Sequence, residues 1–178
     1  MPRWLILLRG VNVGGKGKLP MAELRAALPQ IGAQTVRSYI QSGNLLFDHT
    51  ETDAATLAHR VTELIQTHFG FAPSALALRS DDLDSLLAAL PDPGPIPPNQ
   101  VYLYLSDRAL PADLPATLAR FCTAGETLHL LPRALAVLAP NGIGRSKLAG
   151  PLERTLPAAT TARNLNTLRK LQSLAQSS

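Results

Sequence analysis

Residues 35–48, TVRSYIQSGNLLFD, contain two short β-rich runs joined by the pair Ser42-Gly43. The runs cover residues 35–41 and 44–48, and a serine-glycine pair between two such runs predicts a β-hairpin. A central hairpin suits several folds, so the elements on either side of it decide which fold the chain adopts.

The sequence on each side of the hairpin predicts one strand and one helix. Residues 4–8 (WLILL) predict a buried strand, and Pro20 can open a helix. After the hairpin, Thr52 or Asp53 can cap a helix that ends at Gly70, and residues 75–79 predict a strand. The resulting order, strand-helix-strand-strand-helix-strand, is that of a ferredoxin-like unit, an antiparallel four-stranded sheet backed by two helices.

The second half repeats this order. A helix over 81–90 and a proline-rich linker, 91–98, precede it. Its predicted elements are strand 101–105, helix 114–122, strands 127–131 and 134–139, helix 147–156, strand 158–161 and a helix striped by leucines from Leu165 to Leu174. We therefore expect an α+β protein of two ferredoxin-like subdomains, a structural duplication with a C-terminal helix. The predicted boundaries are 1–90, 91–98 and 99–178.

Composition narrows the class of protein. A hydrophobic fraction of 46% and a charged fraction of 17% in 178 residues exclude a disordered chain and predict a soluble one. The single cysteine, Cys122, and the short apolar run that ends at Arg9 predict a cytoplasmic protein with no membrane association. The net charge of +4 separates into +5 over residues 1–47, −6 over 48–140 and +5 over 141–178.

The first basic region contains a glycine-rich loop. Residues 10–17, GVNVGGKG, follow a strand and nearly match the phosphate-binding pattern G-x-x-x-x-G-K-[ST]. Two features oppose a nucleotide hydrolase: Gly17 replaces the magnesium-binding Ser or Thr, and Pro20 disfavours a helix at Leu19. Glycines and lysines can still present N–H groups and charge to an anion, whereas the alternative is a mobile, solvated loop.

The predicted topology brings polar segments together in pairs. In a ferredoxin-like unit, the loop after the first strand and the hairpin tip leave the sheet at one edge. In the first half these are residues 10–18 and 42–44; in the second half, residues 140–147 and 161–166 share an edge. Residues 142–147, GIGRSK, favour an anion near a helix N-terminus, although Ser146 can simply cap the helix.

Four strings carry a resemblance to a known family. They are LLRGVNVGGK at 7–16, YIQSGN at 39–44, GIGRSK at 142–147 and ARNLNT at 162–167. Together they resemble the bacterial family called domain of unknown function 1697, over about Arg3 to Leu174. That family often has Trp at the position of Leu165. The resemblance implies an α/β protein of two ferredoxin-like subdomains and assigns no activity.

We expect the basic segments to bind an anionic small ligand, a nucleotide or phosphorylated metabolite, in a cleft between the subdomains. Arg163, Asn166 and Lys170 are spaced to share one helix face, and Asn164 can cap that helix. The candidate ligand-binding residues are Arg9, Asn12, Gly14, Gly15, Lys16, Lys18, Tyr39, Gln41, Ser42, Asn44, Arg145, Ser146, Lys147, Arg163, Asn164, Asn166 and Lys170.

Three alternatives stay open: a nucleic-acid-binding protein, a phosphoryl- or acyl-transfer enzyme, and a structural partner of another protein. A pI near 9.6 permits nucleic-acid binding, but 4% aromatic residues disfavour base stacking. No motif identifies a nucleophile or its base, so the catalytic residues are unknown. The four histidines lack metal-ligand spacing, so neither a metal nor another cofactor is predicted.

Overall fold

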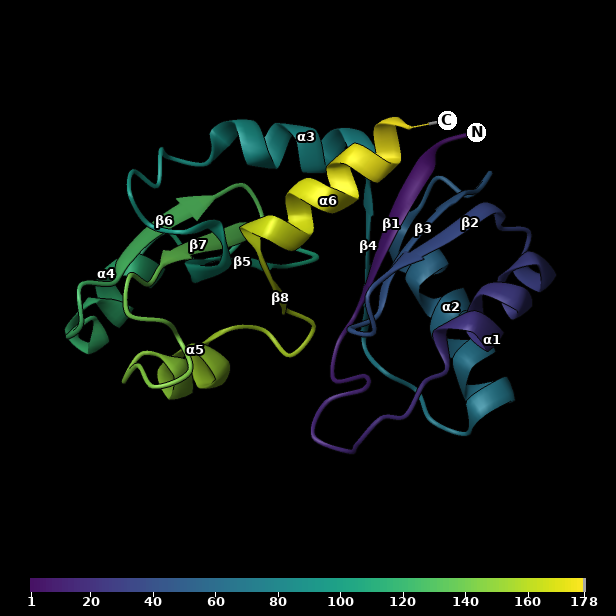
Figure 1. Ribbon diagram of the computed structural model, residues 1–178, viewed down its shortest axis with the longest axis horizontal. Coiled ribbons are helices and arrows are strands. Elements are labelled where there is room, and N and C mark those ends of the chain that lie inside the picture. Colours follow the sequence, from purple (N-terminus) through teal and green to yellow (C-terminus); the bar gives the residue numbers. More distant parts are fainter. Residues whose placement is uncertain (178) are drawn as a thin grey trace. The chain divides into compact units, whose positions relative to one another are not determined.

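The computed structural model describes residues 1–177, which divide into two compact units (Figure 1). The first unit contains Met1–Leu83 and the chain from Leu171 onward, and the second contains Asp84–Lys170. The sequence predicted that the C-terminal helix belongs wholly to the second half. Instead, that helix begins in the second unit and ends in the first.

The first unit contains one antiparallel sheet with the strand order β2-β3-β1-β4. This order and its strand directions are those of the predicted ferredoxin-like arrangement. Helices α1 and α2 cover one face of the sheet (Figure 1). The elements are β1 (Arg3–Leu8), α1 (Met21–Ala27), a 3-10 turn (Leu28–Ile31), β2 (Gln34–Tyr39), β3 (Asn44–Asp48), α2 (Ala54–Phe69), β4 (Ala75–Arg79) and the start of α3 (Ser80–Ala89).

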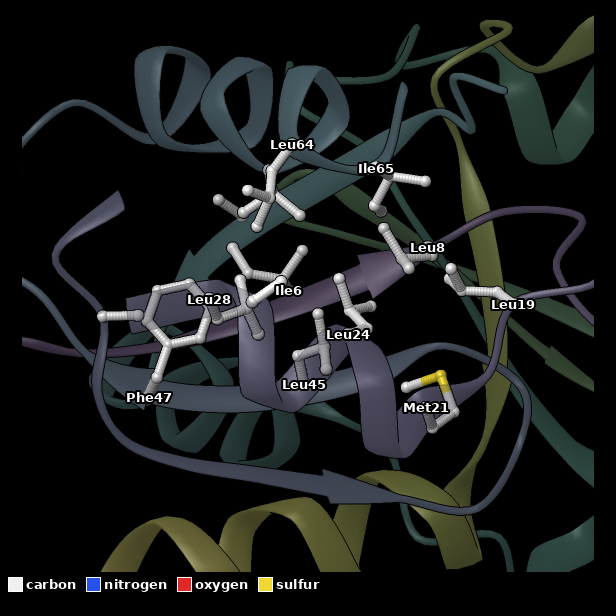
Figure 2. Close-up of a cluster of buried hydrophobic side chains, with 14 of the residues drawn as sticks. Ile6, Leu8, Leu19, Met21, Leu24, Leu28, Leu45, Phe47, Leu64 and Ile65 are labelled. Atoms are coloured by element: carbon white, nitrogen blue, oxygen red, sulfur yellow. The ribbon is translucent and has the colours of Figure 1, made fainter. Parts of the chain in front are cut away.

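Alternation along β1 explains how the first unit is packed. Trp4, Ile6 and Leu8 belong to the core between the sheet and the two helices. Figure 2 shows Ile6 and Leu8 there with Leu24 of α1 and Ile65 of α2. Each of these side chains is at most 1% exposed. Burying a side chain of this size stabilises the fold by about 1.5–3 kcal/mol.

Local sequence signals set the limits of α2 as predicted. Asp53 is its N-cap, and the carboxylate accepts a 2.7 Å hydrogen bond from the Thr56 N–H. Gly70 ends the helix with φ of 80°, a left-handed conformation that glycine adopts without a steric cost.

The second unit repeats the arrangement with the strand order β6-β7-β5-β8. Its helical side buries Leu135 and Val137 of the sheet with Leu118 and Leu152. The elements are the end of α3, a 3-10 turn (Pro98–Gln100), β5 (Val101–Leu105), α4 (Leu114–Leu118), a 3-10 turn (Ala119–Phe121), β6 (Thr127–Leu131), β7 (Ala134–Leu138), α5 (Ala149–Thr155), β8 (Thr161–Asn164) and the start of α6 (Leu165–Gln176). The predicted structural duplication is therefore present in the chain.

The last strand was predicted too early. Residues 158–160 form a turn closed by a 2.9 Å hydrogen bond from the Thr160 N–H to the Pro157 carbonyl. The strand begins at Thr161, opposite Leu105, and extends to Asn164, opposite Tyr102. The prediction followed the apolar residues before Thr161. This edge strand instead forms where the chain pairs with β5, whatever its own side chains favour.

Two arginines hold the end of α6 in the first unit. Arg3, paired with Asp48 at 2.9 Å, donates a 2.8 Å hydrogen bond to the carbonyl of Ala175. Arg37 donates to the carbonyl of Leu174 at 3.3 Å and to the Ser177 hydroxyl at 2.9 Å. Cations at a helix C-terminus satisfy carbonyls that have no partner within the helix.

Among residues 1–177, no helix is both long and apolar enough to cross a bilayer.

Candidate functional site

The loop after β1 is anchored in the core at both ends. Val11 and Leu19, which flank its basic part, are 0% and 1% exposed and belong to the cluster that α1 and α2 cover. Residues 12–18 project between these anchors, and Figure 1 shows this loop in purple after β1. Helix α1 begins only at Met21, so Lys16 stands outside it, as the proline predicted, and the loop is not a nucleotide-hydrolase P-loop.

The projecting part of the loop is a miniature hairpin. Val13 and Lys16 exchange backbone hydrogen bonds of 3.3 and 3.0 Å, and the Asn12 N–H donates to the Gly17 carbonyl at 2.9 Å. The tip is Gly14-Gly15, with φ of 57° and 73°. Two successive positive φ values define the tight hairpin turn that favours glycine at both positions. The glycines therefore supply the positive φ angles that this turn requires.

Asn12 holds the hairpin in place. Its side-chain amide donates to the carbonyls of Leu19, at 2.9 Å, and Gln41, at 2.7 Å, while its oxygen accepts from the Leu19 N–H at 2.9 Å. One side chain thus ties the two ends of the loop together and ties both to the turn between β2 and β3. This is a structural role for a residue that we predicted to contact ligand.

The β2–β3 turn packs against the end of β1. The Leu8 N–H donates to the Gly43 carbonyl at 2.9 Å. A Cβ atom at Gly43 would lie 2.6 Å from Val11 Cγ2 and 2.7 Å from Leu8 Cβ, so only glycine fits this position. The predicted meeting of residues 10–18 and 42–44 at one edge of the sheet is therefore correct.

Three predicted site residues in this turn contribute to its internal structure. Asn44 is 0% exposed and donates to the Tyr39 carbonyl at 3.1 Å and the Ser42 hydroxyl at 2.9 Å. Tyr39 is half-buried, and Gln41 is exposed. The turn thus presents the Gln41 side chain to solvent and keeps the Asn44 amide inside.

The cations of this edge face solvent. Arg9, Lys16 and Lys18 are all exposed. The N–H groups of Gly14 and Gly15 donate to no acceptor within the described residues, and both glycines are exposed at the hairpin tip. A fixed loop that offers lysine ammonium groups and backbone N–H groups has the donors that an anion requires.

The second unit has a loop built in the same way. Residues 144–147 lie between Ile143, which packs against the core of that unit, and Leu148, which is 0% exposed. Arg145 and Lys147 are exposed, and between them the Ser146 hydroxyl donates to the carboxylate of Glu126. Ser146 also accepts a 3.1 Å hydrogen bond from the Leu148 N–H. The N-cap of α5 is Leu148, and no side chain caps this helix, so Ser146 closes a turn before α5 and is not the capping residue that the sequence had left open.

Glu126 is a feature that sequence reasoning missed. Glu126 is only 7% exposed. Its carboxylate accepts a 2.8 Å hydrogen bond from the Ala124 N–H and another from the Ser146 hydroxyl. Burial raises the pKa of this carboxyl, but the bonds from Ser146 and Ala124 outweigh burial and hold the pKa below its ordinary value. Twenty residues separate Glu126 from Ser146, so no local pattern could reveal the pair.

The segment before α6 departs from its prediction. Arg163 belongs to β8, so it cannot share a helix face with Asn166 and Lys170, which are exposed on α6. Arg163 donates to the Thr161 hydroxyl and the Ala162 carbonyl, both at 2.8 Å. Burial lowers the pKa of Arg163 to about 10. Asn164 caps α6 by accepting from the Thr167 N–H at 2.9 Å, as predicted.

The register of the second sheet confirms the other predicted meeting of segments. Leu138, at the end of β7, pairs with Val101, and Asn164, at the end of β8, pairs with Tyr102. The chain therefore leaves both strands at the same edge of the sheet.

Within residues 1–177, no three His, Cys, Asp or Glu side chains gather in a way that could hold a metal ion.

Comparison with known protein families gives a match that covers most of the chain. The profile of the family described as "Protein of unknown function (DUF1697)" matches residues 1–135. The chain belongs to this family. The matched residues of this DUF1697 protein include the glycine hairpin and the β2–β3 turn, whereas residues 142–147 lie beyond them.

A solved structure extends the likeness to almost the whole DUF1697 chain. It is that of a conserved bacterial protein from Streptococcus pneumoniae, 26% identical, with a TM-score of 0.78. The alignment covers 98% of this chain and 99% of the other. No curated protein matches the sequence significantly.

Proposed function

We propose that this DUF1697 protein binds a small anionic ligand, such as the phosphate group of a nucleotide or phosphorylated metabolite, at the hairpin of residues 12–18. The observation that carries the proposal is the brace formed by Asn12, which fixes a loop whose lysines face solvent. A solvated glycine loop would lose conformational entropy on binding, and a loop fixed in advance avoids most of that loss.

The chemistry of the hairpin suits an anion. Lys16 and Lys18 supply two positive charges, and the Gly14 and Gly15 N–H groups supply neutral donors at the tip. Each exposed lysine contributes about 1 kcal/mol or less on its own, so the affinity for a single phosphate group is modest. The loop at residues 142–147, with Arg145 and Lys147, is a second place where an anionic group could be held.

Ligand-induced stabilisation tests the proposal. The single tryptophan, Trp4, lies in the core of the first unit, so its fluorescence reports the unfolding of that unit. Phosphate added at constant ionic strength should raise the melting temperature, because a ligand that binds only the folded state stabilises it. The double variant Lys16→Ala, Lys18→Ala should lose most of this shift.

The matched control is Arg169→Gln, an exposed cation of α6 that also removes positive charge. It should keep the full shift. An equal loss in the control and the double variant would contradict a local site and favour general charge attraction, as in nucleic-acid binding.

A further inference from the structure

Ile40 has an unusual backbone conformation. Its φ is 50°, in the left-handed region that a β-branched residue rarely enters. Such a conformation is unfavourable and persists only where the surrounding structure holds it. Hydrogen bonds on either side hold it here, from Asn44 to the Tyr39 carbonyl and from Asn12 to the Gln41 carbonyl, but Ile40 itself is 50% exposed and gains little from burial.

The other non-glycine residues with positive φ differ from Ile40. Asn12 tolerates the conformation and uses its side chain as a brace. Thr35, in the β2 bulge, hydrogen-bonds to Asp48, and Arg133 lies at an exposed hairpin tip. Ile40 alone among them is aliphatic and largely outside the core. Asparagine or glycine would suit its position better, so the choice of isoleucine points to a contact outside the chain.

A second exposed aliphatic residue lies on the adjoining loop. Val13 is 62% exposed and pairs directly with Lys16 across the miniature hairpin, so the two side chains lie on one face. The Asn12 amide hydrogen-bonds to the Gln41 carbonyl, and these residues are the chain neighbours of Val13 and Ile40. The Cα atoms of Val13 and Ile40 therefore lie at most about 16 Å apart, the sum of two Cα steps, an asparagine side chain and one hydrogen bond.

We infer that the ligand of this edge is an amphiphilic anion, a soluble phosphate monoester whose apolar part contacts Val13 and Ile40. The inference rests on the anion site proposed above and names the class of its ligand. Charge complementarity selects this occupant, because Lys16 stands beside Val13 and Lys18 follows on the same hairpin. An exposed apolar contact adds affinity in proportion to the area that it removes from water.

Two monoesters of equal charge test this inference. Methyl phosphate and hexyl phosphate differ only in apolar length, and isothermal titration compares their affinities for the full chain. We expect hexyl phosphate to bind at least about fivefold more tightly, since only part of its chain is buried. In the double variant Val13→Ser, Ile40→Asn, this ratio should fall to near one while methyl phosphate binds as before.

The control is Leu130→Ser, which removes an exposed aliphatic side chain of β6 in the second unit and should leave the ratio unchanged. Equal binding of both esters to the unaltered protein would overturn the inference and leave the anion site standing. Failure of both esters to bind would overturn the anion site itself. If vesicles of phosphatidylserine and phosphatidylcholine bind the protein and hexyl phosphate does not, the inference of a soluble monoester is overturned in favour of a membrane surface.

Discussion

The side-chain amide of Asn12 donates a 2.7 Å hydrogen bond to the carbonyl of Gln41, across 29 residues of chain. This bond links the loop after β1 to the turn between β2 and β3, two segments that are far apart in the sequence. It joins the two segments as one hydrogen-bonded edge. The proposed anion site, the proposed amphiphilic ligand and most of the predictions below depend on this edge.

Replacing Asn12 with alanine should destabilise the first unit by about 1–3 kcal/mol, because the Leu19 N–H loses its acceptor and two carbonyls lose a donor. Urea denaturation followed by Trp4 fluorescence measures the loss. Asn99→Ala, an exposed asparagine in the second unit, should change stability by less than about 0.5 kcal/mol. A loss no larger than that of the control would show that the brace does not form in solution.

Gly43→Ala should be more harmful than Gly94→Ala. Both glycines have positive φ, of 82° and 59°, so both substitutions strain the backbone. Only at Gly43 would the new methyl group also meet Val11 and Leu8, at 2.6 and 2.7 Å, whereas nothing lies within 4 Å at Gly94. The difference should be about 1–3 kcal/mol, the usual cost of overpacking. Equal losses of unfolding free energy would mean that the turn does not pack on β1.

The strain at Ile40 can be measured without a ligand. Ile40→Asn and Ile40→Ala both remove the aliphatic side chain, but asparagine tolerates positive φ and alanine does not. The asparagine variant should therefore be more stable than the alanine variant by about 0.5–1 kcal/mol. Chemical denaturation of the two variants gives this difference directly, and an alanine variant of equal or greater stability would argue that Ile40 is not strained.

Glu126 should give the second unit an acid-sensitive stability. Its hydrogen bonds from Ser146 and Ala124 hold its folded-state pKa below the usual value of about 4.3 in an unfolded chain. Its stabilising contribution is therefore present above pH ~4.3 and is lost as the pH falls through the lower folded-state pKa. Glu126→Gln should lower stability at pH 7 and flatten the dependence of unfolding free energy on pH below that value. An unchanged slope would show that this carboxyl does not drive the acid response.

Much of the fold was predictable because its signals are local. Leucine and valine patterns located the strands and helices, and the caps at Asp53 and Gly70 fixed the limits of α2. The late start of β8 was missed because its residues, Thr161–Asn164, owe their conformation to pairing with β5. The division of α6 between the units was missed because it depends on Arg3 and Arg37, which lie more than 130 residues away along the chain.

The candidate site was predictable in its composition and not in its roles. The glycines and lysines of residues 10–18 stood out in the sequence, and so did the polar turn that follows β2. Amide side chains look alike as ligand contacts and as structural braces, so only contacts could assign Asn12 and Asn44 to the second role. The prediction that the two basic loops serve one ligand stays a prediction, which non-additive losses of affinity in Lys16→Ala and Arg145→Ala would support.

Amide chemical shifts test the central claim, anion binding at the glycine hairpin, most directly. Phosphate is titrated at constant ionic strength into the ¹⁵N-labelled full chain. We expect saturable shifts that are largest at the Gly14 and Gly15 N–H groups, and at least about fivefold weaker binding when Lys16 and Lys18 are both alanine. Shifts that are absent, or that spread evenly over the exposed cations without saturating, would contradict it.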